Sequence, residues 1–499
     1  MSKSAMRLNH VLILLMMVLL PVSAKSQNRE VIEVNMTLEE VIEMAQRQSL
    51  SYFRAKNMYL AEYWSFRSFK ASRLPSLNLT ATPVAYTNSI IPLQDGVGYR
   101  NNYSFVSNGA LFIRQNVPLT GGTFDITSTL SRTYDYETGN TIFSSAPVSI
   151  GFKQSLNGYN RFRWESRMSP VQFERAKLAF IQDLEDIAYN ATNYFFNVAT
   201  AEINVRIAEI NYANADTLYR IGKGRFEIGT ITQDELLDLE LSLLNARLEV
   251  SKSDINLKQA KATLNSFLGI ADDIHVNCVL PDKLPPLRIN VDEALNLALE
   301  NNPDILGYKL QLLRAERNVA ETTANTGLNA NIEASLGVNR NALELSEVYE
   351  SPFMQQQRAN ISLSIPIIDW GNRKGQIQMA KAQKDEVDAS VKQSLVDFEQ
   401  NALITFLNFN LQEDQVAIAA KADTVAQLGF DVTMQRFMIG KVDVIRLNSA
   451  RNSLDAAKRN YISALRNYWT SYYDIRRIAM YDFINRQSLI RELDEFLQR

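Results

Sequence analysis

The sequence contains the same turn twice, and leucines at helical spacing follow each copy. Arg225 to Glu240 reads RFEIGTITQDELLDLE and Arg436 to Arg451 reads RFMIGKVDVIRLNSAR, so the two turns lie 211 residues apart. A second match, at an offset of 253 residues, joins Met36–Leu60 to Ile289–Leu313. The chain is therefore a tandem structural repeat. The difference between the offsets places about 42 extra residues in the first half, at about residues 95–146.

Apolar and small residues in both halves recur at alternating spacings of three and four, which is the pattern of a coiled-coil seam. One series runs from Leu184 to Ala215 and a second from Leu236 to Phe267, and the second repeats from Leu447 to Ile478. Many seam positions are Ala, Ser or Thr, which predicts that more than two helices pack side by side. A solid helical rod without a lumen is the alternative interpretation.

Proline is absent from residues 171–280 and from the matching part of the second half. Because an interior proline costs a helix about 3 kcal/mol, helices there can be unusually long. Gly371–Met438 would span about 100 Å as one helix. Pro170 predicts a kink or a helix start near the beginning of the first long helix. Shorter helices are expected at Leu38–Arg73 and Thr232–Leu268.

Between the helical segments, apolar residues alternate with small or polar ones at a period of two, which predicts strands. A hairpin turning at Gly121-Gly122 is expected in the insertion, where it either adds two strands or forms an external loop. Two-faced strands suit a soluble sheet over a core or a barrel in a membrane. The four strands expected outside the insertion are Leu77–Val84, Val148–Phe152, Asn331–Val338 and Ile361–Ile368.

Aromatic residues near the strand ends favour the membrane barrel over the soluble sheet. Four strands cannot close a barrel alone, so several copies of the chain would have to contribute. The aromatic residues are Tyr86, Phe152, Tyr159 and Trp370.

Residues 1–24 have the pattern of a signal peptide, with Lys3 and Arg7 ahead of an apolar core and small residues before the expected cleavage point. Its removal changes the formal charge from −3 to −5, so no nucleic acid is expected as a partner. No later run of eighteen apolar residues predicts a membrane-spanning helix, so a membrane-spanning role would have to use strands.

The sequence contains few motifs that would indicate an enzyme. His275 and Cys278 are too few for a closed zinc site, and neither a phosphate-binding loop nor a nucleophile elbow is present. We therefore expect no catalytic residues, no metal and no cofactor. An exported hydrolase would instead need a pair of acids among the carboxylates of the helix surfaces.

Several motifs together resemble the TolC-type outer-membrane efflux proteins over about residues 36–482. They are VDEALNLALENNPDI at Val291–Ile305, PIIDWGNRKGQIQMAKAQ at Pro366–Gln383, and the two RF-x-x-G turns. The resemblance implies a mainly α fold with β, built from long antiparallel coiled-coil hairpins and transmembrane strands. It also implies a homotrimer whose strands close one β-barrel in outer-membrane lipid and whose helices continue as an α-barrel across the periplasm.

As a function, the resemblance implies the outer-membrane channel of a tripartite efflux or type I secretion system that exports small molecules or peptides. Its partners would be a periplasmic adaptor (membrane fusion protein) and an inner-membrane RND or ABC pump. A structural periplasmic coiled-coil protein is the alternative. The expected segments are a signal peptide (1–24), a first repeat (25–288, tip turn 222–232), a second repeat (289–480, tip turn 437–443) and a tail (481–499).

The twin turns are similar to the family's adaptor-docking tips at the periplasmic end. Many members carry two aspartates after the second tip glycine, where this chain has Arg446 and Ser449, so its gate would differ. Pairing of Arg446 with Asp443 or Asp234 would be a weak latch of about 0 to 1 kcal/mol. The docking candidates are Ile228, Gly229, Thr230, Ile439, Gly440 and Lys441, and the gate candidates are Asp234, Asp238, Asp443 and Arg446.

Overall fold

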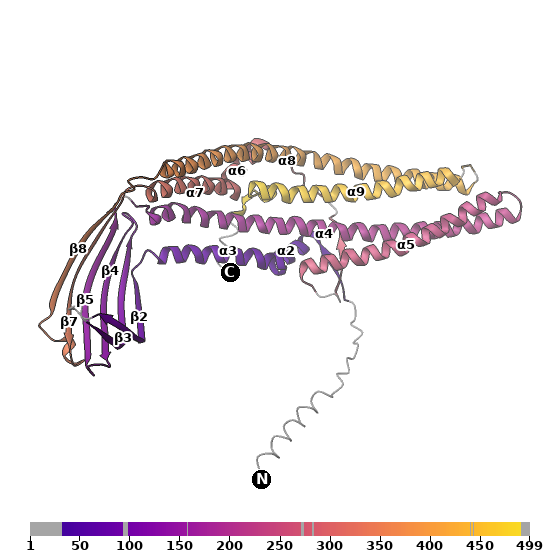
Figure 1. The fold of residues 1–499 in the computed structure, drawn as a ribbon. Coiled ribbons are helices and arrows are strands. Elements are labelled where there is room, and N and C mark those ends of the chain that lie inside the picture. The colour runs from indigo at the N-terminus through magenta and orange to yellow at the C-terminus, as the bar shows by residue number, and fades with distance from the viewer. Residues whose placement is uncertain are drawn as a thin grey trace, which may run out of the picture. The chain divides into compact units, whose positions relative to one another are not determined.

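A computed structural model describes residues 32–92, 98–156, 158–270, 274–281, 284–439, 441–442 and 444–490 (Figure 1). The predicted signal peptide lies outside these residues. The chain divides into two compact units, which are Met1–Glu40 with Asn197–Leu280 and Val41–Phe196 with Pro281–Arg499. Within the described residues, no helix combines the length and the apolar character needed to cross a bilayer.

The helices of the two halves repeat almost residue for residue. The long helices α4 (Arg161–Glu227) and α8 (Asn372–Met438) each have 67 residues, and the return helices α5 (Gln233–Leu268) and α9 (Val444–Ala479) each have 36. The absence of proline therefore predicted the long helices correctly. Pro170 lies inside α4, nine residues after its first residue, so the helix begins before the proline.

The helix expected at Leu38–Arg73 is two helices, α2 (Leu38–Gln48) and α3 (Leu50–Ala71), so the prediction of one helix was wrong. Ser49 separates them because its extended backbone leaves the helix and its hydroxyl caps α3 by accepting the Tyr52 N–H. The second half has the same break. Asn302 separates the second-half helices and caps the latter one, which begins with a proline; they are α6 (Val291–Asn301) and α7 (Pro303–Asn325).

One antiparallel sheet of six strands lies in the second unit, in the order β2-β3-β4-β5-β7-β8 (Figure 1). All four strands expected outside the insertion are present, although the last ends at Ser364. The insertion adds two more through a hairpin that turns at Gly121, whose φ is +82°. The strands are β2 (Ser76–Pro92), β3 (Tyr99–Val117), β4 (Gly122–Asp135), β5 (Thr141–Ser155), β7 (Asn329–Ala342) and β8 (Met354–Ser364).

Two strand pairs and a 3₁₀ turn were not expected from the sequence. Strands β1 (Ile32–Thr37) and β6 (Ile274–Val279) pair in parallel in the first unit, although more than 230 residues separate them. A short 3₁₀ turn, η1 (Glu347–Tyr349), lies between β7 and β8. Strands β9 (Tyr481–Asp482) and β10 (Gln487–Ser488) form a small hairpin after α9.

A buried ion cluster joins the two repeats within the second unit. The Arg476 guanidinium of α9 donates to both carboxylate oxygens of Glu185 on α4, at 2.9 Å each, and to Asp482 at 2.7 Å. Burial alone would raise the pKa of Asp482, but the Arg476 charge and donors from Asn485 and Tyr472 hold it below its usual value. The cluster therefore fixes the chain after α9 against helices from both repeats.

Replacing Arg476 by Met should lower the free energy of unfolding by about 3–5 kcal/mol, because Glu185 and Asp482 would remain buried without a counter-charge. The neighbouring Arg477 is a matched control, because its side chain is 34% exposed and pairs with Asp186 and Asp474. Its replacement by Met should cost about 1 kcal/mol or less. Denaturation of the purified protein in detergent measures both values, and equal losses would contradict the assignment.

Candidate functional site

The first tip is a tight helix reversal built around Gly229. After α4 ends, the Gly229 N–H donates to the Phe226 carbonyl and the Thr230 N–H donates to the Arg225 carbonyl, both at 2.9 Å. This pair of bonds is the Schellman motif, which needs a residue with positive φ at its centre. Gly229 has a φ of +74°, which glycine adopts more easily than other residues, so the backbone conformation explains why a glycine stands at this position.

The second tip repeats one of these bonds at the equivalent position. The Lys441 N–H donates to the Arg436 carbonyl at 2.9 Å, and both residues lie 211 positions after their counterparts Thr230 and Arg225. Gly440 and Asp443 lie outside the described residues. The repeated turn in the sequence is therefore a repeated backbone geometry.

Both tips present an isoleucine to solvent. The residue before the tip glycine is Ile228 in the first tip, 75% exposed, and Ile439 in the second, 66% exposed. These exposed isoleucines at the ends of the two hairpins are apolar surface that a partner protein could cover. Of the predicted docking residues, Thr230 and Lys441 are also exposed.

Two of the gate candidates, Asp234 and Asp238, lie in the first turns of α5. Thr232 and Glu235 form a reciprocal capping box, in which each side chain accepts the backbone N–H of the other. A hydrogen bond from the Thr232 side chain and then backbone N–H groups lower the pKa of Asp234, which stays ionised. Asp238 is one turn further on, so both exposed acids lie on one face of α5.

Arg446 lies in the first turn of α9 and is exposed. It belongs to the second unit, whereas Asp234 and Asp238 belong to the first. Pairing of Arg446 with Asp234 or Asp443 stays a prediction.

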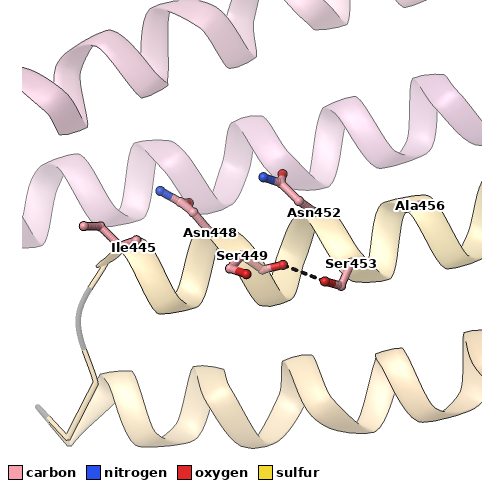
Figure 2. A pocket seen from close by; sticks show the side chains of 6 residues that line it. All are labelled: Ile445, Asn448, Ser449, Asn452, Ser453 and Ala456. Atoms are coloured by element: carbon pink, nitrogen blue, oxygen red, sulfur yellow. Dashed lines mark hydrogen bonds between the residues drawn. The ribbon is translucent and has the colours of Figure 1, made fainter.

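A polar hollow that was not predicted from the sequence lies on α9 beside the second tip. Figure 2 shows that Asn448 and Asn452 project in the same direction, with the Ser453 hydroxyl bonded to the Ser449 carbonyl at 2.9 Å. The hollow has a volume of about 580 Å³, and Ile445 and Ala456 complete its lining. Small polar residues at spacings of three and four were the signal for it.

The sheet has one apolar face that is exposed to solvent. Residues paired across neighbouring strands point to the same face, and one such row is Leu77, Ile113, Ile126, Ile150 and Leu336. Each of these five side chains is between 37% and 64% exposed. A soluble sheet would cover such a band with a core.

The opposite face of the sheet is polar and carries ion pairs. The next row contains Arg114 and Asp125, whose side chains lie 2.6 Å apart, and Lys153 pairs with Glu333 at 3.3 Å. Apolar rows and rows with charged residues therefore alternate along the strands. This alternation is typical of strands with lipid on one side and water on the other.

Aromatic rings gather at the two ends of the apolar face. Tyr103 packs against Tyr86 and Tyr136 at the end of the sheet where β2 connects to β3 and β4 connects to β5. The ring centroids are 5.5 and 4.3 Å apart. Phe124 and Phe152 pack at 4.7 Å near the end from which the helices start.

The part of the chain that the structure describes contains no cluster of three or more His, Cys, Asp or Glu residues that could hold a metal ion. Burial raises the pKa of the Cys278 thiol, and Glu202 adds to the shift, so this thiol stays protonated.

Comparison with known proteins agrees with this geometry. The family model for the outer membrane efflux protein matches residues 119–270 and 294–479. The outer membrane efflux protein BepC of Brucella suis is 23% identical over 357 residues, which cover 70% of this chain and 73% of BepC. Toxin and drug export protein A of Aggregatibacter actinomycetemcomitans is 19% identical over 320 residues, which cover 61% of this chain and 69% of that protein.

Solved structures share the fold at low sequence identity. The Campylobacter jejuni CmeC outer membrane channel has a TM-score of 0.66 and 15% identity, with 92% of this chain and 88% of CmeC covered. The outer membrane protein VceC of Vibrio cholerae has a TM-score of 0.62 and 14% identity, with 89% and 95% covered.

Helix packing beside the first tip gives a matched test. A Cβ atom at Gly222 would lie 2.4 Å from Leu239 Cδ1, whereas a Cβ at Gly224 would meet nothing within 4 Å. Gly222→Val should therefore cost about 1–3 kcal/mol through overpacking. Gly224→Val should be neutral or slightly stabilising, because valine is a better helix former than glycine. The free energy of unfolding checks both, and equal effects would contradict close approach of α4 and α5.

Proposed function

The chain belongs to the outer membrane efflux protein family, and from this premise we propose that it works as a homotrimeric exit duct of a tripartite efflux or type I secretion system. Outer-membrane location and a channel role in efflux come with the family. The observation that carries the proposal furthest is the two-faced sheet, with an exposed apolar band opposite an ion-paired polar face.

The dimensions of the apolar band suit outer-membrane lipid. The eleven residues from Phe124 to Tyr134 are separated by ten steps of about 3.4 Å, so they extend about 34 Å along a strand. At a strand tilt of about 40° this becomes about 26 Å, close to the apolar height of about 25 Å in outer-membrane barrels. The aromatic clusters at both ends would then lie at the two membrane interfaces. A structural periplasmic rod, the alternative function, leaves this band unexplained.

The helices favour association of several copies. Helix α5 packs one apolar seam against α4 and exposes a second apolar row. Helix α8 also exposes an apolar row. A helix with two seams can pack in a ring of helices. The row on α5 is Leu237, Leu241, Leu244, Leu248 and Ile255, and the row on α8 is Val396, Leu403, Leu407, Leu411, Ile418, Val425, Leu428 and Val432. We propose that these rows meet between copies and that three copies enclose an α-barrel.

The two tips would then be the periplasmic end of the duct, where they dock a periplasmic adaptor that connects to an inner-membrane RND or ABC pump. Ile228 and Ile439 are the proposed anchors, and the tip residues beside them shape the contact. The gate would include Asp234, Asp238, Asp443 and Arg446. Small molecules or peptides are the proposed cargo, in keeping with the name of the toxin and drug export relative.

Leu248→Glu should break the trimer, because it places a charge in the exposed seam of α5, where Leu248 is 67% exposed. Asn256→Glu is the matched control, since Asn256 is exposed on α5 and lies off both seams. The protein mass of the complex, measured after mild detergent extraction of outer membranes, should be that of a trimer for the wild type and the control. A wild-type protein that is soluble and monomeric would overturn the proposed duct.

Ile228→Ser together with Ile439→Ser should weaken adaptor docking while the trimer remains intact. Burial of one isoleucine contributes about 1.5–3 kcal/mol, so each substitution should lower adaptor affinity about tenfold or more. Photo-crosslinkers placed at these two positions in intact cells would identify the bound protein, and dye efflux would report transport. Ile210→Ser is the control, because Ile210 is 51% exposed on α4 away from the tip. Equal losses in both variants would contradict docking at the tips.

A further inference from the structure

We propose that the membrane barrel of this protein has eighteen strands, six from each of three copies, with β8 of one copy paired to β2 of the next. The inference rests on the proposed trimer. The tandem repeat predicts one strand pair per half, which would give four strands per chain. The six-stranded sheet instead takes four strands from the first half and two from the second.

The extra hairpin is part of the sheet. Strand β3 pairs with β2 on one side and β4 on the other, and β4 pairs in turn with β5. No register shift interrupts the β3–β4 ladder from Ser104–Asp135 to Val117–Gly122. The insertion therefore contributes interior strands of the six-stranded sheet.

The side chains of the hairpin follow the two-faced pattern of the other strands. Leu111, Ile113 and Ile126 lie on the apolar face and are 44%, 37% and 44% exposed. Arg114 and Asp125 form their ion pair on the polar face. An external loop in water would have no reason to expose an apolar row in line with the rest of the sheet.

The two edges of the sheet complement each other. All neighbouring strands are antiparallel, so in a set of six the edge strands β2 and β8 run in opposite directions. A second copy can therefore add its β2 to β8 as one more antiparallel partner. Unpaired backbone groups at both edges favour this closure, because lipid cannot satisfy them.

The apolar band also continues across the edges. Leu77 and Leu79 on β2 are 64% and 71% exposed, and Ile361 and Leu363 on β8 are 68% and 64% exposed. Register pairs place these four side chains on the same face as Ile126 and Ile150 in the middle of the sheet. Joining β8 to β2 of the next copy thus gives one unbroken lipid-facing belt, so a second copy of this chain is the occupant that fits both edges.

Eighteen strands would make the pore wide. Barrel diameter grows about linearly with strand number, and barrels of 16 to 18 strands enclose an aqueous channel. The pore would be about one and a half times as wide as one built from four strands per chain. Its wall would carry the Arg114–Asp125 and Lys153–Glu333 pairs, which suits bulky, hydrated cargo.

Electron cryomicroscopy of the full chain in lipid nanodiscs would count the strands in a cross-section of the barrel. Eighteen strands would support the inference. A barrel of twelve, with residues 99–135 outside the wall, would overturn it while leaving the trimeric duct intact. Particles without a closed barrel would overturn both the inference and the proposed duct.

A variant that lacks Tyr99–Asn140 is the matched control, because β2, β5, β7 and β8 still alternate in direction after removal of one antiparallel pair. It should form a barrel of twelve strands. An unchanged strand count between the variant and the full chain would contradict the inference.

Disulfide mapping of the full chain tests the edges independently of imaging. Cysteines at Asn78 or Thr80 on β2 are combined with cysteines at Asn360 or Ser362 on β8, and the protein is oxidised in the membrane. In an antiparallel pair the partner's number falls as the residue number rises, so Thr80 should react with a lower-numbered β8 position than Asn78 does. The cross-links should join different copies. Cross-links only between identical strands would overturn the proposed closure.

Discussion

The architecture depends on apolar surface that one chain cannot bury by itself. Each return hairpin buries one seam between its two helices, as at Gly222 and Leu239, but α5 and α8 keep a second row exposed. The sheet has the same property, because its apolar face and both of its edges lack a partner among the residues that the structure describes. Exposed apolar rows of this extent are unfavourable in water, so the proposed assembly with further copies and with lipid would stabilise the fold.

The two repeats share backbone geometry and differ in the chemistry placed on it. Arg225 and Arg436 accept the same backbone bond, and an exposed isoleucine precedes each tip glycine. After the turn, however, the first repeat has Thr232 and Glu235 in a capping box, where the second has Asp443 and Arg446. A duplicated hairpin can thus keep its turn while the charges beside it diverge, and the proposed trimer would present six tips of two kinds.

Local features of the fold could be predicted from the sequence. Proline absence and heptad spacing predicted α4, α5, α8 and α9, and period-two alternation predicted four strands. The break at Ser49 was missed because a serine between two helical stretches is common inside helices as well as at caps. Whether the insertion paired with the sheet also stayed open, since two-faced strands are compatible with several partners.

Long-range contacts could not be predicted in this way. The parallel pair β1–β6 and the Arg476 cluster with Glu185 and Asp482 join residues that no local pattern connects. The two tip turns could be located because the same turn sequence occurs twice in the chain. The Asn448 and Asn452 hollow was missed because its signal is a single stripe of small polar side chains on one helix.

The size of the insertion follows from a parity constraint. Each strand reverses the direction of the chain, so one added strand would start the following helix α4 at the opposite end of the sheet from its counterpart α8. Two added strands restore the direction, and they also keep β2 and β8 antiparallel. If the sheet closes through its edges as proposed, a duplicated protein can widen its barrel only by whole hairpins, and the hairpin that turns at Gly121 would be one such step.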